Sequence, residues 1–196
     1  MQKFQVVHVI PSNIKNGIRS VIGTTVLNEN LYVARMKAGQ IEVYDTKEGF
    51  ALTSQIAVAG MKDPTCLEAC QRNNCLYIGH SGRLAWIHRL NLSTSQLTQW
   101  SVEGQPRAFS ITKESNLLVT LRSANKVCEF TPSGRILREV KLDSSIDRPL
   151  HAIKLPNGQF LVSHSGSDED RVCVVGIRLD KSFTSTADFR ARLMTS

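Results

Sequence analysis

Several features that mark common classes of protein are missing from this 196-residue sequence. No apolar run approaches the roughly 20 residues that a membrane-spanning helix needs. Residues 1–10 contain neither the long apolar core nor the small-residue cleavage site of a signal peptide. We therefore expect a cytoplasmic chain, or a piece of a longer protein, with no membrane partner.

Signatures of catalysis are also missing. The sequence contains no Gly-rich phosphate loop, no G-x-S-x-G or H-E-x-x-H motif and no paired-carboxylate motif. We expect no catalytic residue, no cofactor and no small-molecule substrate.

The cysteines form no disulfide framework, because their number is odd and their spacing is irregular; they are Cys66, Cys70, Cys75, Cys128 and Cys173. No Cys-x-x-Cys pair and no histidine at ligand spacing accompanies them, which disfavours a zinc site. Cys128 and Cys173 lie at matching places in strand-like runs, where cysteine behaves as a small buried apolar residue. We expect reduced, buried thiols and no bound metal.

Helical periodicity is missing as well, since no window of 11 or more residues before Thr184 shows a convincing 3.6-residue pattern. The sequence instead repeats a unit of short strands and turns, which is clearest in residues 148–177. In this unit a proline precedes a half-apolar strand, and a tight turn at residues 156–158 reverses the chain. Strands rich in β-branched residues follow, bounded by Gly, Asn and Asp.

Two sets of positions define the period of this repeat. The prolines that open copies two, three and four are 42 and 43 residues apart, at Pro64, Pro106 and Pro149. The residues that mark the second strand of each copy are 45, 41 and 43 apart, at Leu31, Leu76, Leu117 and Phe160. A period near 43 residues with four short strands is typical of the blades of a β-propeller, so the sequence predicts an all-β fold.

The copies read P-x-A-(I/F)-x-(I/L), then N-x-(L/F)-(L/Y)-V, then (R/K)-V-C-(E/V)-(F/V). This pattern resembles NHL-type six-bladed propellers, in particular those that end many animal tripartite-motif proteins, and the resemblance covers roughly residues 21–177. It implies a non-catalytic domain that recruits protein substrates for a ubiquitin ligase. The cysteine and histidine patterns of RING and B-box domains are missing here, so ligase activity would need domains outside this chain.

Four copies of about 43 residues cannot close a ring of about six blades. We therefore expect a partial propeller over residues 1–178, with a closed four-bladed ring as the alternative. An irregular or weakly helical tail is expected over residues 179–196, with a short amphipathic helix around residues 187–194. Residues 4–10 are predicted to form a lone outer strand.

The net charge is +7, and the excess positive charge falls in two sets of loops, those that precede the inner strands and those between second and third strands. These loops share one face in a four-stranded blade, and this face is the predicted partner-binding face. Its residues are Arg19, Arg35, Lys62, His80, Arg83, Arg107, Arg122, Lys126, Arg148 and His164. The two histidines end the second strand of their copies, where they either face solvent or share a contact with a ligand.

A non-catalytic module that presents this basic face to a protein partner is the favoured function. Single-stranded RNA is the alternative, although the acidic run at residues 168–170 and the shortage of aromatic residues in the loops disfavour it. A metal-dependent, lactonase-like hydrolase is the second alternative, for which Glu68 would be the only carboxylate on an inner strand.

Overall fold

In a computed structural model of the protein, residues 20–82, 84–165 and 170–176 are described. Within these ranges the chain forms strands and turns but no helix, and therefore no helix long and apolar enough to cross a membrane. The predicted outer strand at residues 4–10 and the predicted tail with its short helix lie outside these ranges.

The described residues form four antiparallel sheets, which we call blades 1 to 4 in chain order. Blade 1 contains β1 (Val21–Leu27), β2 (Asn30–Arg35), β3 (Gln40–Asp45) and β4 (Ala51–Ala57). Blade 2 contains β5 (Pro64–Cys70), β6 (Cys75–His80), β7 (Ala85–Asn91) and β8 (Leu97–Val102). Blade 3 contains β9 (Pro106–Ile111), β10 (Leu117–Leu121), β11 (Lys126–Phe130) and β12 (Ile136–Lys141). Blade 4 contains β13 (Pro149–Lys154), β14 (Phe160–Ser165) and β15 (Asp170–Val175).

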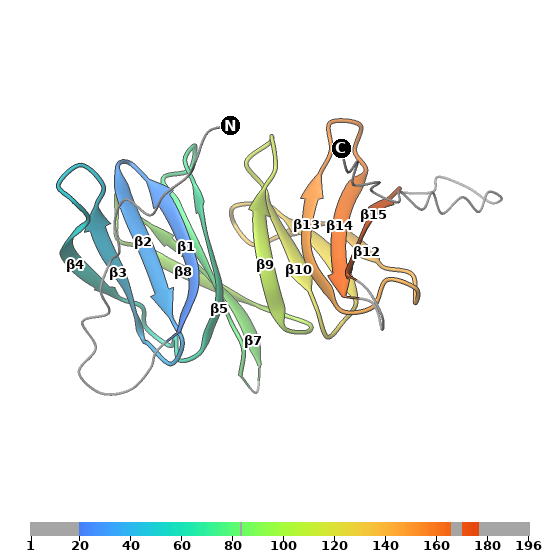
Figure 1. Cartoon of the computed structure of the whole chain (residues 1–196), viewed down its shortest axis with the longest axis horizontal. Helices are drawn as coiled ribbons and strands as arrows, with labels where there is room; N and C mark the ends of the chain where they lie inside the picture. Colours follow the sequence, from blue (N-terminus) through green and yellow to red (C-terminus); the bar gives the residue numbers. More distant parts are fainter. Residues whose placement is uncertain (1–19, 83, 166–169, 177–196) are drawn as a thin grey trace, which may run out of the picture.

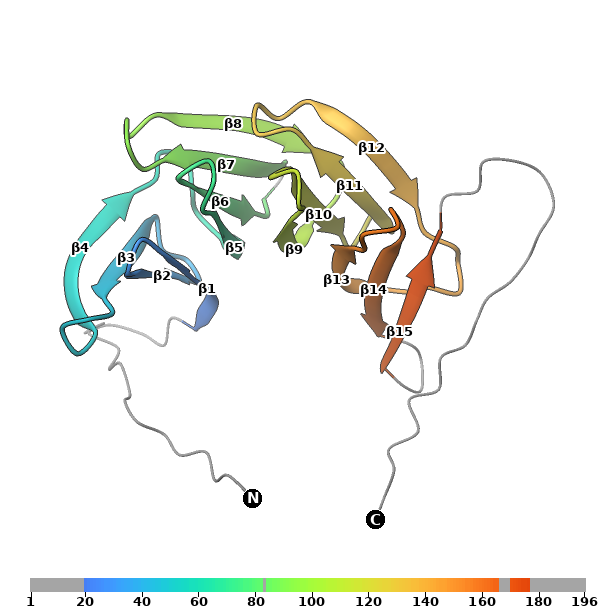
Figure 2. The same cartoon turned by 90° about the horizontal axis from the view of Figure 1, so that it is seen from above.

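The blades stand side by side along an arc (Figures 1 and 2). Their first strands form the inner side of the arc and contact one another in the order β1, β5, β9 and β13. Figure 2 shows that the arc stays open between blade 1 and blade 4. The predicted all-β architecture of blade-like sheets is thus confirmed, and the alternative of a closed four-bladed ring is wrong.

The strand registers confirm the predicted repeat. The three prolines that open the copies each begin an inner strand and pair with equivalent residues of the second strands, which are His80, Leu121 and His164. Arg35 of blade 1 holds the same position opposite Val21. The predicted second-strand markers all lie four residues before these positions. Equivalent residues of different blades can therefore be compared directly.

Neighbouring blades pack face to face. We call the face of a blade that points toward the start of the arc, from blade 4 to blade 1, its leading face and the opposite face its trailing face. Alternating residues of a strand belong to opposite faces. One apolar cluster joins the trailing face of blade 1, including Tyr32 and Ile41, to the leading face of blade 2, including Ile78. Two further clusters join blades 2 and 3 and blades 3 and 4. The core is therefore a series of contacts between neighbouring sheets.

The cysteines belong to these clusters. Four of them are buried, Cys173 is partly buried, and all five are free thiols. Burial raises the pKa of the Cys66 thiol to about 12, so this thiol is protonated at neutral pH. The prediction of reduced and largely buried cysteines is confirmed, and Cys128 and Cys173 hold equivalent positions opposite Val119 and Val162.

Gly79 lets blades 2 and 3 approach closely. A Cβ atom at this position would lie 2.6 Å from the Cys66 Sγ atom and 2.9 Å from the Phe109 ring. Replacement of Gly79 by alanine is therefore expected to lower the free energy of unfolding by about 2 kcal/mol through overpacking. Urea denaturation measures this change. Gly39→Ala is the control, since a Cβ there meets one atom at 3.3 Å, and a loss as large as that of Gly79→Ala would contradict the explanation.

Candidate functional site

The loops that were predicted to share one face do meet there. The loop before the first strand of a blade hydrogen-bonds to the loop after its second strand. The Ser81 amide donates to the Asp63 carbonyl at 3.2 Å, and the Arg122 amide donates to the Gln105 carbonyl at 3.0 Å. We call this side of the arc the loop face. Two of its ten predicted residues, Arg19 and Arg83, lie outside the described residues.

Arg35 does not contribute a solvent-exposed charge to the loop face, because its side chain is buried on the leading face of blade 1. Its Nε atom donates to Glu42 Oε2 at 2.8 Å, and the Tyr44 hydroxyl donates to the same oxygen at 2.8 Å. Burial disfavours the charged guanidinium, but hydrogen bonds to Glu42 and Tyr44 outweigh burial and raise the pKa of Arg35. The residue is part of a buried polar cluster within blade 1.

His80 and His164 occupy equivalent positions, as predicted, but neither faces solvent. The His80 ring packs against the buried His88 ring of β7, with centroids 5.0 Å apart. Burial, followed by the charge of His80, lowers the pKa of His88 to about 4. Within the described part of the chain, neither ring nitrogen of His88 has a hydrogen-bond partner, and neither does His164 Nδ1. The expectation of solvent-facing histidines is therefore wrong.

Lys126 and Arg148 carry charges that neighbouring carboxylates offset. Lys126 Nζ lies 2.8 Å from Glu103 Oε2 and 2.9 Å from Glu139 Oε1, and these contacts raise the pKa of Lys126. Arg148 Nε lies 3.1 Å from Asp147 Oδ2. Both residues lie at the loop face, but their charges are partly neutralised there.

Lys62, Arg107 and Arg122 complete the predicted set. Lys62 and Arg107 are exposed and Arg122 is half-buried. Across residues 20–82, 84–165 and 170–176, no ion pair involves any of these three. The accessible positive charge of the loop face therefore rests on fewer side chains than the sequence suggested.

A groove opens on the loop face where blades 2 and 3 meet, with a volume of about 620 Å³. Its wall combines carboxylates, hydroxyls and apolar side chains from four loops, and it includes Asp63, Ser81, Leu84, Val102, Glu103 and Ser123. Lys62, Arg107 and Arg122 lie within two residues of groove residues in the chain. The groove wall thus carries the carboxylate of Asp63, a Glu103 carboxylate that pairs with Lys126, and apolar side chains, with further cations close to it in sequence.

Sequence reasoning alone misses this groove. In the sequence, Asp63 is an acidic residue among basic ones in its loop, and Glu103, Ser81 and Ser123 belong to no recognisable motif. Their positions in the two sets of loops are the available signal, because the reasoning that selects Arg107 and Arg122 applies equally to their neighbours.

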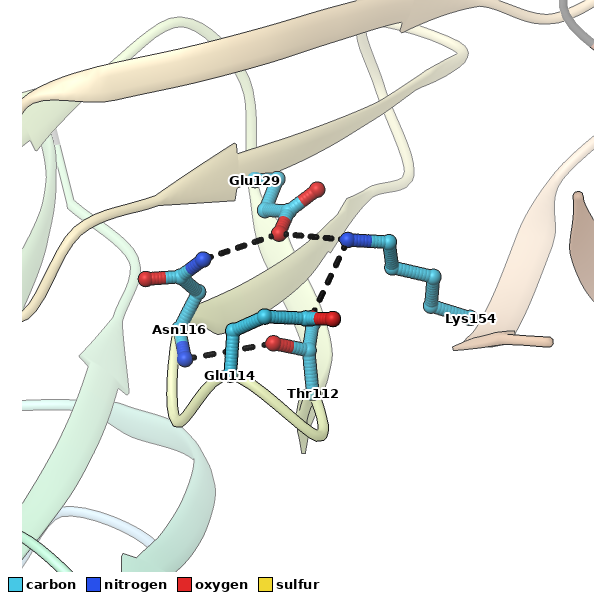
Figure 3. Close-up of polar contacts among 5 residues, drawn as sticks. All are labelled: Thr112, Glu114, Asn116, Glu129 and Lys154. Carbon is cyan, nitrogen blue, oxygen red and sulfur yellow. Dashed lines mark hydrogen bonds and ion pairs between the residues drawn. The ribbon is translucent and has the colours of Figure 1, made fainter. Parts of the chain in front are cut away.

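A second polar cluster lies at the opposite end of the strands and joins blades 3 and 4 (Figure 3). Lys154 Nζ lies 3.0 Å from Glu129 Oε1 and 3.2 Å from Glu114 Oε2. Glu129 Oε1 also accepts a hydrogen bond from the side-chain Nδ2 of Asn116 at 3.0 Å. The backbone amide of Asn116 donates to Thr112 Oγ1 at 3.2 Å. Burial disfavours the charged amine, but the hydrogen bonds to Glu129 and Glu114 outweigh burial and raise the pKa of Lys154. A charged amine held by two carboxylates fits a structural joint rather than a nucleophile.

Glu68, the carboxylate that the hydrolase alternative would use, is hydrogen-bonded within the protein. Glu68 Oε1 accepts hydrogen bonds from the Ala69 amide at 2.9 Å and from the Thr25 hydroxyl at 3.3 Å. Among the residues that the structure describes, no group of three or more His, Cys, Asp or Glu side chains could hold a metal ion. Glu68 instead links the inner strands of blades 1 and 2.

Comparison with solved structures identifies the fold. The chain is similar to Kuenenia stuttgartiensis hydrazine synthase, with a TM-score of 0.68 and 12% identity over 85% of this chain and 49% of that chain. It is similar to virginiamycin B lyase from Staphylococcus aureus, with a TM-score of 0.63 and 14% identity over 86% of this chain and 59% of that chain. A chain of the mitotic checkpoint complex is also similar, with a TM-score of 0.62 and 16% identity over 80% of this chain and 49% of that chain.

These likenesses support a β-propeller fold, and the chain spans about half the length of the structures that it matches. No protein-family model matches the sequence, and no curated protein matches it. The similar structures include enzymes and a member of a protein complex, so the shared fold is compatible with either kind of function.

Proposed function

We propose that the chain is a non-catalytic protein-interaction module that binds an extended polypeptide segment in the groove on the loop face. The observation that carries this proposal is the composition of the groove wall. Asp63 supplies negative charge, and Glu103 adds a carboxylate that it shares with Lys126, while Leu84 and Val102 supply apolar surface. An open groove with this mixture suits a peptide that places a basic side chain beside an apolar one.

The same wall disfavours RNA as the ligand. Phosphate groups need accessible cations, and the carboxylate of Asp63 would repel them inside the groove. Lys126, which could have neutralised a phosphate, already lies between Glu103 and Glu139. The remaining cations near the groove would contact acidic side chains that flank the basic residue of a bound peptide.

The likeness of the repeats to NHL propellers extends this proposal to substrate recruitment for a ubiquitin ligase whose other domains lie outside this chain. The similarity to a chain of the mitotic checkpoint complex supports a role in protein assembly more generally.

Peptide selection tests the proposal. We expect a displayed library of random peptides to yield binders that contain lysine or arginine next to an apolar residue. Replacement of Asp63 by asparagine should weaken their binding about tenfold, because a charge-assisted contact is lost from a partly desolvated groove. Fluorescence anisotropy with a labelled peptide measures the dissociation constant.

Glu48→Gln is the matched control, since Glu48 is exposed in the turn between β3 and β4, at the opposite end of the strands. It should leave the affinity unchanged, and a single-stranded oligonucleotide should not displace the peptide. Equal affinities for the native chain and Asp63→Asn, or displacement by the oligonucleotide, would remove the support for a peptide groove.

A further inference from the structure

The trailing face of blade 4 exposes apolar side chains at positions that the other blades bury. Val172, which pairs with Ser163 of β14, is 53% exposed. The equivalent residues of blades 1, 2 and 3 are 0%, 0% and 1% exposed, and they are Ile41, Ile87 and Val127. Ile153 and Val174 on the same face are 39% and 46% exposed. This face therefore has the composition of an interface between blades, but among the described residues no following blade covers it.

The leading face of blade 1 lies at the other end of the arc and is exposed along its inner strand. Val21 and Val26 of β1 are 50% and 60% exposed. Farther out on the same face, Val33 and Tyr44 are buried within the chain. The inner strand thus offers the accessible part of this face.

Equivalent positions show how a trailing face and a leading face match. Glu129 of blade 3 and Lys154 of blade 4 meet across their interface as an ion pair (Figure 3). The equivalent residues between blades 1 and 2 are Val43 and Ala69, which belong to one apolar cluster. Between blades 2 and 3 the same positions hold Arg89 and Ile111.

At the two open ends of the arc, this pair of positions holds Val174 and Val26. Both side chains are exposed and apolar. The trailing face of blade 4 and the leading face of blade 1 are therefore complementary, because two apolar side chains can pack where Glu129 and Lys154 form an ion pair between blades 3 and 4.

We propose that a second copy of this chain docks on the trailing face of blade 4 through the leading face of its own blade 1. Two such contacts, related by a two-fold axis, close a ring from two four-bladed arcs. The chain aligns with only 49–59% of the length of the similar solved structures, which fits an arc that supplies about half of a complete propeller. This inference is independent of the peptide groove.

Sedimentation velocity of the native chain, from about 1 to about 200 µM, tests for association in the range of weak interfaces. We expect a species of twice the 21.8 kDa mass of the chain to dominate at high concentration. A native chain that stays monomeric throughout this range overturns the proposal.

Variants at the two valines identify the contact. Val174→Glu and Val26→Lys should each raise the dissociation constant of the dimer at least tenfold, because each places an unpaired charge in an apolar contact. The double variant should recover most of the lost affinity, because it recreates the chemistry of Glu129 and Lys154. Ile136→Glu on the outer strand β12, where Ile136 is 54% exposed, is the control and should leave the dimer intact.

The single variants also distinguish this arrangement from a contact between two trailing faces. Val26→Lys would leave a contact between two trailing faces untouched, so a fully dimeric Val26→Lys variant overturns the head-to-tail arrangement. A double variant that is weaker than both single variants overturns it as well. Far-UV circular dichroism of each variant confirms that the sheets remain folded.

Discussion

Replacement of Lys154 by alanine is expected to lower the free energy of unfolding by about 3 kcal/mol, as found when one partner of a buried ion pair is removed. The reason is the carboxylate left behind. Glu129 is only 3% exposed, and without Lys154 it keeps the hydrogen bond from Asn116 but no counter-charge. Urea denaturation followed by tryptophan fluorescence or circular dichroism measures the loss.

Lys126→Ala is the matched control, because Lys126 is also a lysine that pairs with two carboxylates. Its partners Glu103 and Glu139 are 81% and 45% exposed and regain water when the lysine is removed. A smaller loss is therefore expected than for Lys154→Ala. If the two variants lose the same stability, burial of Glu129 is not what makes the joint between blades 3 and 4 strong.

Acidification from pH 7 to pH 4 is expected to cost about 3 kcal/mol of stability through His88 alone, since one pKa unit corresponds to about 1.4 kcal/mol. The side chain is 1% exposed, and the pKa of His88 falls from its ordinary 6.5 to about 4 in the folded chain. Between these values the unfolded state binds a proton that the folded state excludes. The contribution of His88 is therefore complete above pH 6.5 and is lost as the pH falls through this window.

The variant His88→Met isolates this effect. Both ring nitrogens of His88 lack hydrogen-bond partners within the described residues, so an apolar side chain should be tolerated at pH 7. Chemical denaturation at several pH values should show a shallower loss of stability for His88→Met than for the native chain. Parallel losses in the two proteins would rule out His88 as the source of acid sensitivity.

The repeat is the part of the fold that the sequence predicts. Apolar positions, prolines and turns recur because neighbouring blades pack against each other in the same way, and this requirement produces a periodic pattern in the sequence. The same periodic pattern places Cys128 and Cys173 at equivalent positions and indicates the register of the second strands.

The surroundings of individual polar side chains could not be predicted in this way. Arg35 and His80 end a strand, and the sequence does not say whether a neighbouring sheet or loop covers a strand end. The partner of Arg35 is Glu42, on the adjacent strand, and its burial depends on packing outside the hairpin. The groove was missed for a related reason, since it forms only where loops of two blades meet.

The arrangement of the blades has a consequence for how the chain folds. Among the described residues, the inner-strand contacts run from each blade to the next, so this part of the structure is close to a one-dimensional array of coupled units. In such an array, a unit at the end is held by one interface and a unit in the middle by two. In the monomer, no blade follows blade 4 among the described residues, so blade 4 should open more readily than blades 2 and 3, and docking of a second copy should reduce this difference.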